Sequence, residues 1–281
     1  MKKTIVVTVA LAVLFAFASS CASKSEDDWA YIQQSGKLVI GYTEYEPMNY
    51  TDSSGKLVGF DTEFAQDVCA KLGLTPDFVL INWNSKENEL NSKSIDCIWN
   101  GLTVTADRQR DMSFTESYLR NQQVVVVQSA NASQYTDLSS LSDKSLVAEQ
   151  GSAGEMDIQA ALPDANYTPV DTQANALMEV KAGTADAAVI DLTMANSMTG
   201  PGTDYADLSV VSGVQMQPEE YAVGFRLNST AVDRVNAVMT ELMNDGTLAA
   251  LAQKYNLTDL LIAPDSSASA SPAVAVSASA S

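Results

Sequence analysis

Short apolar segments alternate with longer amphipathic segments over residues 30–264, and this alternation limits the fold more than any other feature. Strands are predicted at 37–42, 77–81, 95–99, 123–128, 146–149, 187–190 and 220–226. Helices are predicted at 60–72, 86–91, 155–162, 172–182, 232–245 and 247–255. In the first helix, Asp61 suits the N-cap and Gly73 the stop. The pattern predicts an α/β fold of two lobes, in which helices cover mainly parallel sheets.

The N-terminus has the pattern of an export signal. Lys2 and Lys3 precede an apolar run from Ile5 to Ala18, which is shorter than the ~20 residues of a membrane span. We expect residues 1–20 to be a signal peptide, Cys21 to be lipidated, and residues 21–29 to link the anchor to the folded body. The alternative is an ordinary secretory signal beside an incidental Cys21, since Ala18 stands where a lipobox usually has leucine. Residues 265–281, almost entirely serine and alanine, predict a disordered tail.

Charge and histidine content exclude several functions. The formal charge of −19 argues against a nucleic-acid partner, because phosphate backbones would be repelled. The absence of histidine excludes Ser-His and Cys-His catalysis and removes the commonest metal ligand. We expect no cofactor and no metal. Cys69 and Cys97 form either a disulfide or two buried thiols.

Four stretches match one known pattern in order and spacing. They are 55–61 (GKLVGFD), 95–108 (IDCIWNGLTVTADR), 149–154 (EQGSAG) and 185–191 (ADAAVID). A C-terminal pattern follows at 245–248 and 254–255. Over about residues 36–260 the chain resembles the polar amino-acid binding proteins of ABC importers, the bacterial extracellular solute-binding proteins of family 3.

The resemblance implies a type II periplasmic-binding fold. Lobe 1 would be discontinuous, formed by residues 30–123 and 222–264, and lobe 2 would be inserted as residues 124–221. The two connecting strands, near 123–128 and 220–224, would form the hinge.

An amino-acid ligand requires a particular set of charges. Burying its carboxylate and its ammonium costs several kcal/mol per ion unless each is paired. The resemblance implies that Arg108 holds the carboxylate, which its guanidinium fork fits, and that Asp191 holds the ammonium. The alternatives are a solvated Arg108 and an Asp191 that caps a helix.

Further contacts to the ligand are predicted around Arg108 and Asp191. By resemblance, Asn100, Gly101 and Thr103 supply backbone and hydroxyl contacts. The turn of Ser152, Ala153 and Gly154 opens a helix, where unpaired N–H groups and the helix dipole favour an anion. Simple capping by Ser152 is the alternative, and both can hold.

Aromatic and acidic side chains remain. By resemblance, Tyr45 forms an aromatic wall of the site, with Glu44 beside it. Trp83 and Trp99 either line the ligand's side-chain pocket or belong to the core. Glu44 and Glu87 hint at a polar or cationic ligand.

The predicted function is capture of a free amino acid by hinge closure and delivery to an ABC permease. The protein would be a monomer, lipid-anchored outside the cytoplasm. Two alternatives are a periplasmic dehydratase-like enzyme on the same fold and an amino-acid sensor lipoprotein that does not transport.

Overall fold

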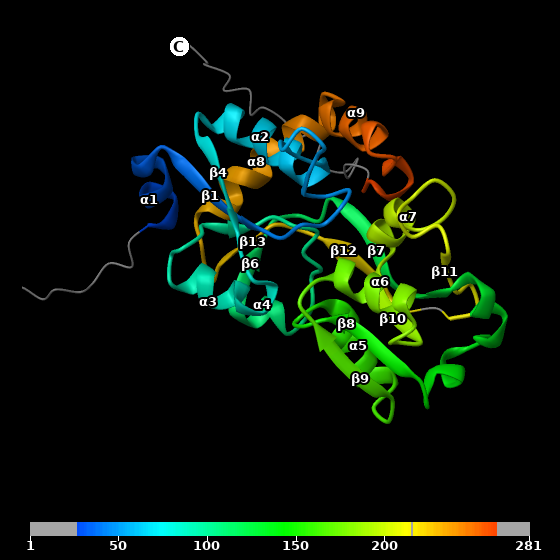
Figure 1. Cartoon of the computed structure of the whole chain (residues 1–281). Coiled ribbons are helices and arrows are strands. Elements are labelled where there is room, and N and C mark those ends of the chain that lie inside the picture. Colours follow the sequence, from blue (N-terminus) through cyan, green and yellow to red (C-terminus); the bar gives the residue numbers. More distant parts are fainter. Residues whose placement is uncertain (1–26, 215, 263–281) are drawn as a thin grey trace, which may run out of the picture.

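The computed structural model describes residues 27–214 and 216–262, which form two lobes, each built on its own β-sheet (Figure 1). The predicted signal peptide, Cys21 and the predicted tail lie outside these residues. Helix α1 (Asp28–Ser35) includes the last two residues of the predicted linker, which was drawn at 21–29. Among the helices of the described residues, none combines the length and the apolar character that a bilayer span requires.

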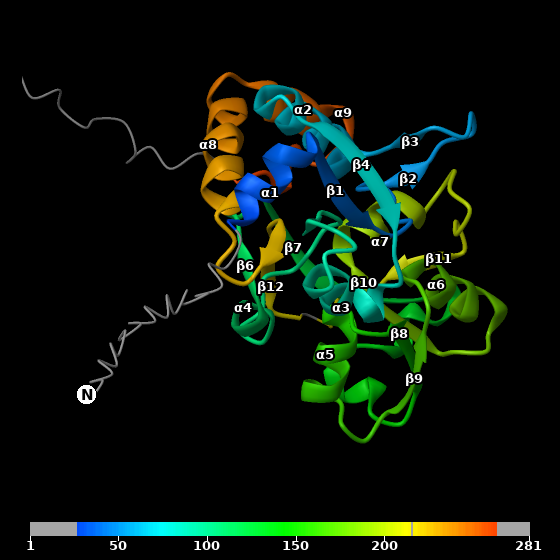
Figure 2. The same cartoon turned by 90° about the vertical axis from the view of Figure 1, so that its left-hand side faces the viewer.

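The first lobe is built on a five-stranded sheet in the order β4-β1-β5-β13-β6. Its strands are β1 (Lys37–Tyr42), β4 (Thr75–Leu80), β5 (Cys97–Ile98), β6 (Met112–Phe114) and β13 (Gly224–Arg226). Its helices, besides α1, are α2 (Phe60–Leu72), α3 (Lys86–Asn91), α4 (Arg108–Asp111), α8 (Ala231–Asn244) and α9 (Thr247–Lys254). A short hairpin, β2 (Tyr50–Thr51) with β3 (Leu57–Val58), projects at one edge (Figure 2).

The second lobe is built on a sheet in the order β11-β7-β10-β8-β9, with β12 paired to β7. Its strands are β7 (Leu119–Gln128), β8 (Ser145–Glu149), β9 (Asn166–Val170), β10 (Ala187–Asp191), β11 (Leu208–Val210) and β12 (Pro218–Tyr221). Its helices are α5 (Ala153–Ala161), α6 (Gln173–Ala182) and α7 (Leu192–Met198). Short 3-10 turns occupy Trp83–Ser85, Ser129–Gln134, Leu138–Leu141 and Thr258–Leu260.

Both sheets are mixed rather than mainly parallel. In each, three strands run parallel: β4, β1 and β5 in the first lobe and β9, β8 and β10 in the second. Strands β13 and β7 then pair antiparallel to β5 and β10. The alternation of strands and helices therefore predicted the α/β class correctly, but not the antiparallel additions.

Strand β7 connects the two halves of the molecule. Its first four residues pair with β12, and its later residues pair with β10 and β11. The sequence expectation of one strand over 220–226 is wrong, since β12 ends at Tyr221 and β13 begins at Gly224 in the other sheet. The lobe boundaries drawn from the resemblance stay a prediction.

Helix α2 shows both a confirmed and a wrong prediction. Phe60, Phe64 and Val68 are buried along one face, and Gly73 ends the helix in the left-handed conformation, as predicted. Asp61, however, is not the cap: the helix begins at Phe60. The Asp61 carboxylate is instead buried and accepts a hydrogen bond from the Gly101 N–H at 2.6 Å.

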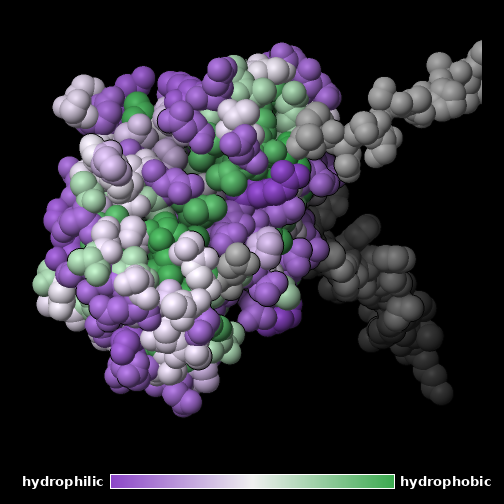
Figure 3. Space-filling model, turned by 90° about the vertical axis from the view of Figure 1, so that its right-hand side faces the viewer, coloured by the Kyte–Doolittle hydropathy of each residue, from purple (hydrophilic) through white to green (hydrophobic). Residues whose placement is uncertain are grey.

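The two cysteines of the folded body and the exposed apolar side chains bear on two earlier predictions. Cys69 and Cys97 are free, buried thiols, which decides between the two predicted states. Figure 3 shows a face on which hydrophilic side chains predominate and hydrophobic ones form small groups. The most exposed large apolar residues of the described chain are Leu80 on β4, Met178 on α6 and Leu227 in the turn after β13. A monomer stays a prediction.

Candidate functional site

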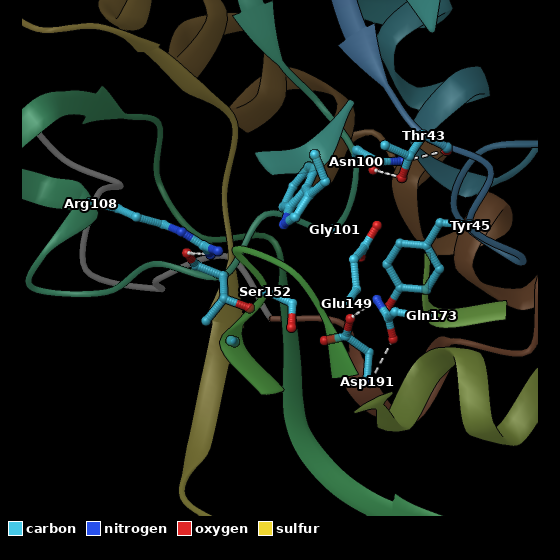
Figure 4. A pocket seen from close by; sticks show the side chains of 12 residues that line it. Thr43, Tyr45, Asn100, Gly101, Arg108, Glu149, Ser152, Gln173 and Asp191 are labelled. Carbon is cyan, nitrogen blue, oxygen red and sulfur yellow. Dashed lines mark hydrogen bonds between the residues drawn. The ribbon is translucent and has the colours of Figure 1, made fainter. Parts of the chain in front are cut away.

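A small cavity lies between the lobes and is lined from both sides (Figure 4). The enclosed volume is about 10 Å³. The lining residues are Thr43, Tyr45, Trp83, Asn100, Gly101, Thr103, Arg108, Glu149, Ser152, Ala153, Gln173 and Asp191. Nine of the eleven predicted site residues are among them, and the two exceptions are Glu44 and Gly154.

The carboxyl ends of parallel strands place these side chains. Asn100 and Gly101 follow β5 in the first lobe, while Glu149 and Asp191 end β8 and β10 in the second. Parallel strands end at the same edge of a sheet, so the residues that follow them meet there. The two edges face each other across the cavity.

Arg108 is buried, with 3% of its surface exposed, so the alternative of a solvated arginine is wrong. Its Nη1 donates to the Thr103 carbonyl at 2.8 Å, and its Nη2 donates across the cavity to the Gly151 carbonyl at 3.0 Å. Its Nε finds no partner among the described residues. The guanidinium also lies 5.8 Å from the centre of the Trp83 ring.

Lys86 is a second buried cation next to Arg108. Its Nζ donates to the Gly151 carbonyl at 3.0 Å and lies 4.8 Å from the centre of the Trp83 ring. Burial lowers the pKa of Lys86 to about 8, and the nearby Arg108 charge acts in the same direction. One carbonyl of the second lobe therefore accepts from two cations of the first.

The Asp191 carboxylate is held by four donors from three elements, the strands β7 and β12 and the helix α6. Its Oδ1 accepts from Asn121 Nδ2 at 2.7 Å, from Gln123 Nε2 at 2.8 Å and from the Tyr221 hydroxyl at 2.8 Å. Its Oδ2 accepts from Gln173 Nε2. Asp191 directly precedes α7, but its side chain makes no capping bond, so the capping alternative is wrong.

The turn into α5 performs the predicted capping. Ser152 Oγ accepts from the Glu155 N–H at 3.1 Å, and Glu155 Oε2 accepts from the Gly151 N–H at 2.6 Å. The N–H groups of Ala153 and Gly154 donate to no residue that the structure describes. Two backbone donors therefore remain at the start of the helix, where an anion is favoured.

Gly154 itself packs rather than lines the cavity. A Cβ at this position would lie 2.6 Å from the Val189 carbonyl oxygen, so the absent side chain lets α5 approach β10. Gly101 has a similar role in the first lobe. Its φ is 55°, and a Cβ there would lie 2.6 Å from Tyr45 Cε1, so only glycine fits beside the ring.

Tyr45 lines the cavity, and its contact with a ligand stays a prediction. Its ring is buried, and its hydroxyl reaches the second lobe, where it bonds to Thr193 and lies 2.6 Å from the Tyr221 hydroxyl. Trp83 also lines the cavity. Trp99 does not: it belongs to the core, with its ring centre 5.2 Å from that of Phe64.

Glu44, a predicted site residue, does not line this cavity. Its side chain is exposed and accepts from the Thr51 hydroxyl at 2.7 Å and from the Thr51 N–H at 2.9 Å. Its neighbours Thr43 and Tyr45 line the cavity instead. Side chains alternate along an extended chain, so Glu44 points away from the site.

Three lining residues were not predicted: Thr43, Glu149 and Gln173. Glu149 opens the third matching stretch, and its position at a strand end was a usable signal. Gln173 begins α6, and its side chain also accepts from the Asp191 N–H at 2.9 Å, so it orients Asp191. Thr43 donates to Asn100 Oδ1 at 2.7 Å.

Charges of both signs surround the cavity, and the two acidic groups Glu149 and Glu219 interact with Arg108 as well as with Asp191. Arg108 and Lys86 lie at one end, beside Trp83 and Gly151. Burial and then Asp191 raise the pKa of Glu149 to about 8, while Lys86 and Arg108 act in the opposite direction. Burial and then Asp191 also raise the pKa of Glu219 to about 8. Arg108 and Asp191, buried with opposite charges around one cavity, suit a zwitterion.

Comparison with known proteins agrees with this geometry. The model of the bacterial extracellular solute-binding proteins, family 3, matches residues 38–258. The L-cystine-binding protein TcyA of Bacillus subtilis is 30% identical over 270 residues, which covers 91% of this chain and 97% of that protein. The arginine-binding extracellular protein ArtP of the same species is 26% identical, over 91% of this chain and 98% of its own.

Solved structures give the same assignment. A substrate-binding protein of an ABC uptake transporter from Streptococcus pneumoniae, with bound histidine, is 30% identical and superposes with a TM-score of 0.75. The match covers 84% of this chain and 99% of that chain. These relatives are named as binding proteins, not as enzymes. The chain therefore belongs to the bacterial extracellular solute-binding proteins of family 3 and has their two-lobe type II periplasmic-binding fold.

Proposed function

We propose that this protein captures a free amino acid with a polar side chain between its lobes and delivers it to an ABC permease. The observation that carries the proposal is the placement of Arg108 and Asp191. Both are buried, both line one cavity, and they approach it from different lobes. A zwitterion that spans the gap would pair its two charges with these two side chains.

The carboxylate of the ligand would bind at the cationic end. The Arg108 Nε is unpaired among the described residues, and the Ala153 and Gly154 N–H groups are unpaired on the opposite lobe. A carboxylate between them would receive charge-assisted hydrogen bonds from both sides. The same contacts would draw the second lobe onto the first.

The ammonium would bind at Asp191. The donors from Asn121, Gln123 and Gln173 fix the orientation of this carboxylate before a ligand arrives. A preoriented anion loses little side-chain entropy on binding. Tyr45 would cover the ligand and, through its hydroxyl, connect to Asp191 by way of Tyr221.

Entry of the ligand requires the lobes to separate. A cavity of about 10 Å³ holds about one water, whereas small-molecule sites span about 300 Å³ or more. Contacts that cross the gap include Arg108 with Gly151, Tyr45 with Thr193, and Ser197 Oγ with Glu46 Oε1 at 3.0 Å. Breaking these while bending β7 and β12 would open the site by a hinge motion.

Attachment and delivery complete the proposal. Lipidation of Cys21 would keep the binding protein at the outer face of a membrane, close to its permease. Metabolic labelling with a fatty acid should label the wild type and leave Cys21→Ser unlabelled. A labelled Cys21→Ser protein would contradict the anchor without touching amino-acid binding.

Thermal unfolding in the presence of each of the twenty amino acids and cystine tests the binding function. A ligand that binds only the folded protein raises its melting temperature. We expect one or a few polar amino acids to do so. No shift with any of them at millimolar concentration would refute the proposal. Uptake of the best ligand by cells with and without the protein separates transport from sensing, and a turnover assay on the same ligand separates binding from catalysis.

A further inference from the structure

Among the ionisable side chains that line the cavity in the described chain, that of Glu149 alone makes no hydrogen bond. It is 4% exposed, ends β8, and lines the cavity. Its carboxylate accepts no hydrogen bond from any residue in 27–214 or 216–262. In the view of Figure 4 its side chain is seen between those of Arg108 and Tyr45.

The two neighbouring carboxylates are different. Asp191 accepts from four side chains, and Glu219 accepts from Thr103, Asn121 and Gln123. Their charges are dispersed by the protein itself. The ionised form of a buried carboxyl group without donors is unfavourable, so a cation brought by a ligand would stabilise it.

Counting the charged groups of the cavity wall gives the charge of that ligand. Among the residues that line the cavity, Arg108 contributes +1, while Asp191 and Glu149 contribute −1 each, which gives a net charge of 1 − 2 = −1 when all are ionised. Two largely buried groups lie just outside this lining. Lys86 Nζ pairs with Glu87 Oε1 at 3.2 Å, and Glu219 is acidic, so the excess of negative charge remains. A neutral zwitterion would satisfy Arg108 and Asp191 and leave Glu149 buried without a counter-charge. An amino acid with a cationic side chain would compensate all three.

We propose that Glu149 is the specificity-determining residue of the site and selects amino acids whose side chain ends in a cation. The inference rests on the proposed function, since it assigns the carboxylate of the ligand to Arg108 and its α-ammonium to Asp191. Glu149 would then pair with the cation at the end of the ligand's side chain. The ligand class comprises arginine, lysine and ornithine.

Arginine and citrulline form the test pair, because they share shape and length and differ in the charge of the terminal group. Calorimetry should show that the wild type binds arginine, or whichever of the three cationic amino acids binds best, at least tenfold more tightly than citrulline. In Glu149→Gln the preference for arginine over citrulline should fall to threefold or less. Glu44→Gln is the matched control, because it makes the same change at an exposed carboxylate outside the cavity and should keep the wild-type preference.

Each other outcome overturns the inference. Equal or tighter binding of citrulline, glutamine or cystine by the wild type would do so, and so would a Glu149→Gln protein that keeps the preference for the cation. A uniform loss of affinity for all ligands in Glu149→Gln would place this residue on the α-ammonium instead. Binding of neutral amino acids without preference defeats this inference alone, whereas binding of no amino acid defeats the proposed function with it.

Proton release gives a second readout that a merely structural residue would not produce. Burial and then Asp191 on β10 raise the pKa of Glu149 to about 8, while Lys86 on α3 and Arg108 on α4, which also face it, act in the opposite direction. At pH 7 the free protein therefore holds a proton there, and a bound cation would expel it. Calorimetry in buffers of different ionisation enthalpy should detect release of up to one proton with arginine, less with citrulline, and none that depends on the ligand's charge in Glu149→Gln.

Discussion

Replacing Arg108 by alanine tests the central contact of the proposed site. The guanidinium is 3% exposed, so its interaction with a ligand carboxylate would be almost fully desolvated. Truncating one partner of such a pair costs about 2–5 kcal/mol, because the other charge is left buried and unpaired. At 1.4 kcal/mol for each factor of ten, Kd for the best amino acid should rise by roughly 30-fold to several thousand-fold.

The free protein should tolerate this change. Arg108 donates to the Thr103 and Gly151 carbonyls, and the Gly151 carbonyl keeps its second donor, Lys86 Nζ at 3.0 Å. Only the Thr103 carbonyl is left unpaired, which costs about 1–3 kcal/mol. A domain with about 5–15 kcal/mol of stability survives that loss, so the change in Kd can be read from folded protein.

Two further variants make the measurement specific. Arg108→Lys keeps the charge but loses the fork that fits a carboxylate, so we expect an intermediate affinity. Arg110→Ala removes a neighbouring arginine that is 68% exposed in its side chain and pairs with the exposed Asp107 at 2.7 Å. Its Kd should stay within about twofold of wild type. Calorimetry that finds Arg108→Ala within threefold of wild type would refute the carboxylate assignment.

Three other predictions address stability. Arg226→Met should lower the free energy of unfolding, measured with urea, by about 3–5 kcal/mol, because Asp28 and Asp96 lose a partner that lies 2.8–2.9 Å from both. Lys37→Met breaks an exposed pair and should cost less than about 1 kcal/mol; equal effects would contradict the reasoning. Gly101→Ala should cost more than Gly55→Ala, since both have positive φ but only Gly101 lies against the Tyr45 ring; similar urea midpoints would count against that contact. Between pH 5 and pH 8 the melting temperature of the wild type should fall more steeply than that of Glu149→Gln. The reason is that the folded protein keeps a proton on Glu149 up to about pH 8, whereas the unfolded chain loses it near pH 4.5. Parallel curves of melting temperature against pH would exclude that proton.

The elements that the sequence predicted best are those whose side chains alone specify them. Strand β1 was predicted at its observed bounds, because Lys37–Tyr42 is a short apolar run that becomes a central strand. Helix α2 was predicted from a stripe of apolar residues and a glycine stop. Strand β9 was missed, since Asn166–Val170 lies at a sheet edge, is largely exposed and contains a proline. Its strand conformation comes from pairing with β8, which no local pattern encodes.

The site was predictable to the extent that strand ends mark it. Asn100 and Asp191 follow apolar strands, so their position was available from periodicity together with the matching stretches. Glu149 also ends a strand, β8, but a glutamate before a loop is usually exposed to solvent. Its burial depends on how the two lobes meet, which local sequence does not specify. Glu44 was expected beside the ligand but lies outside the cavity. A shift of one residue along an extended chain reverses the direction of a side chain, and the sequence did not specify the register there.

Arg108 and Lys86 both donate to the Gly151 carbonyl, so a ligand could replace the bond from Arg108 without leaving this buried carbonyl unpaired. Affinity reports the difference between the contacts that a ligand makes and those that it displaces. On the proposed mechanism, a carboxylate takes the Arg108 guanidinium away from the Gly151 carbonyl. That carbonyl would be left unpaired, at about 1–3 kcal/mol, if Arg108 were its only donor. Lys86 also donates to it, so the exchange leaves no orphaned carbonyl, and the gain from the new ion pair is kept as binding energy.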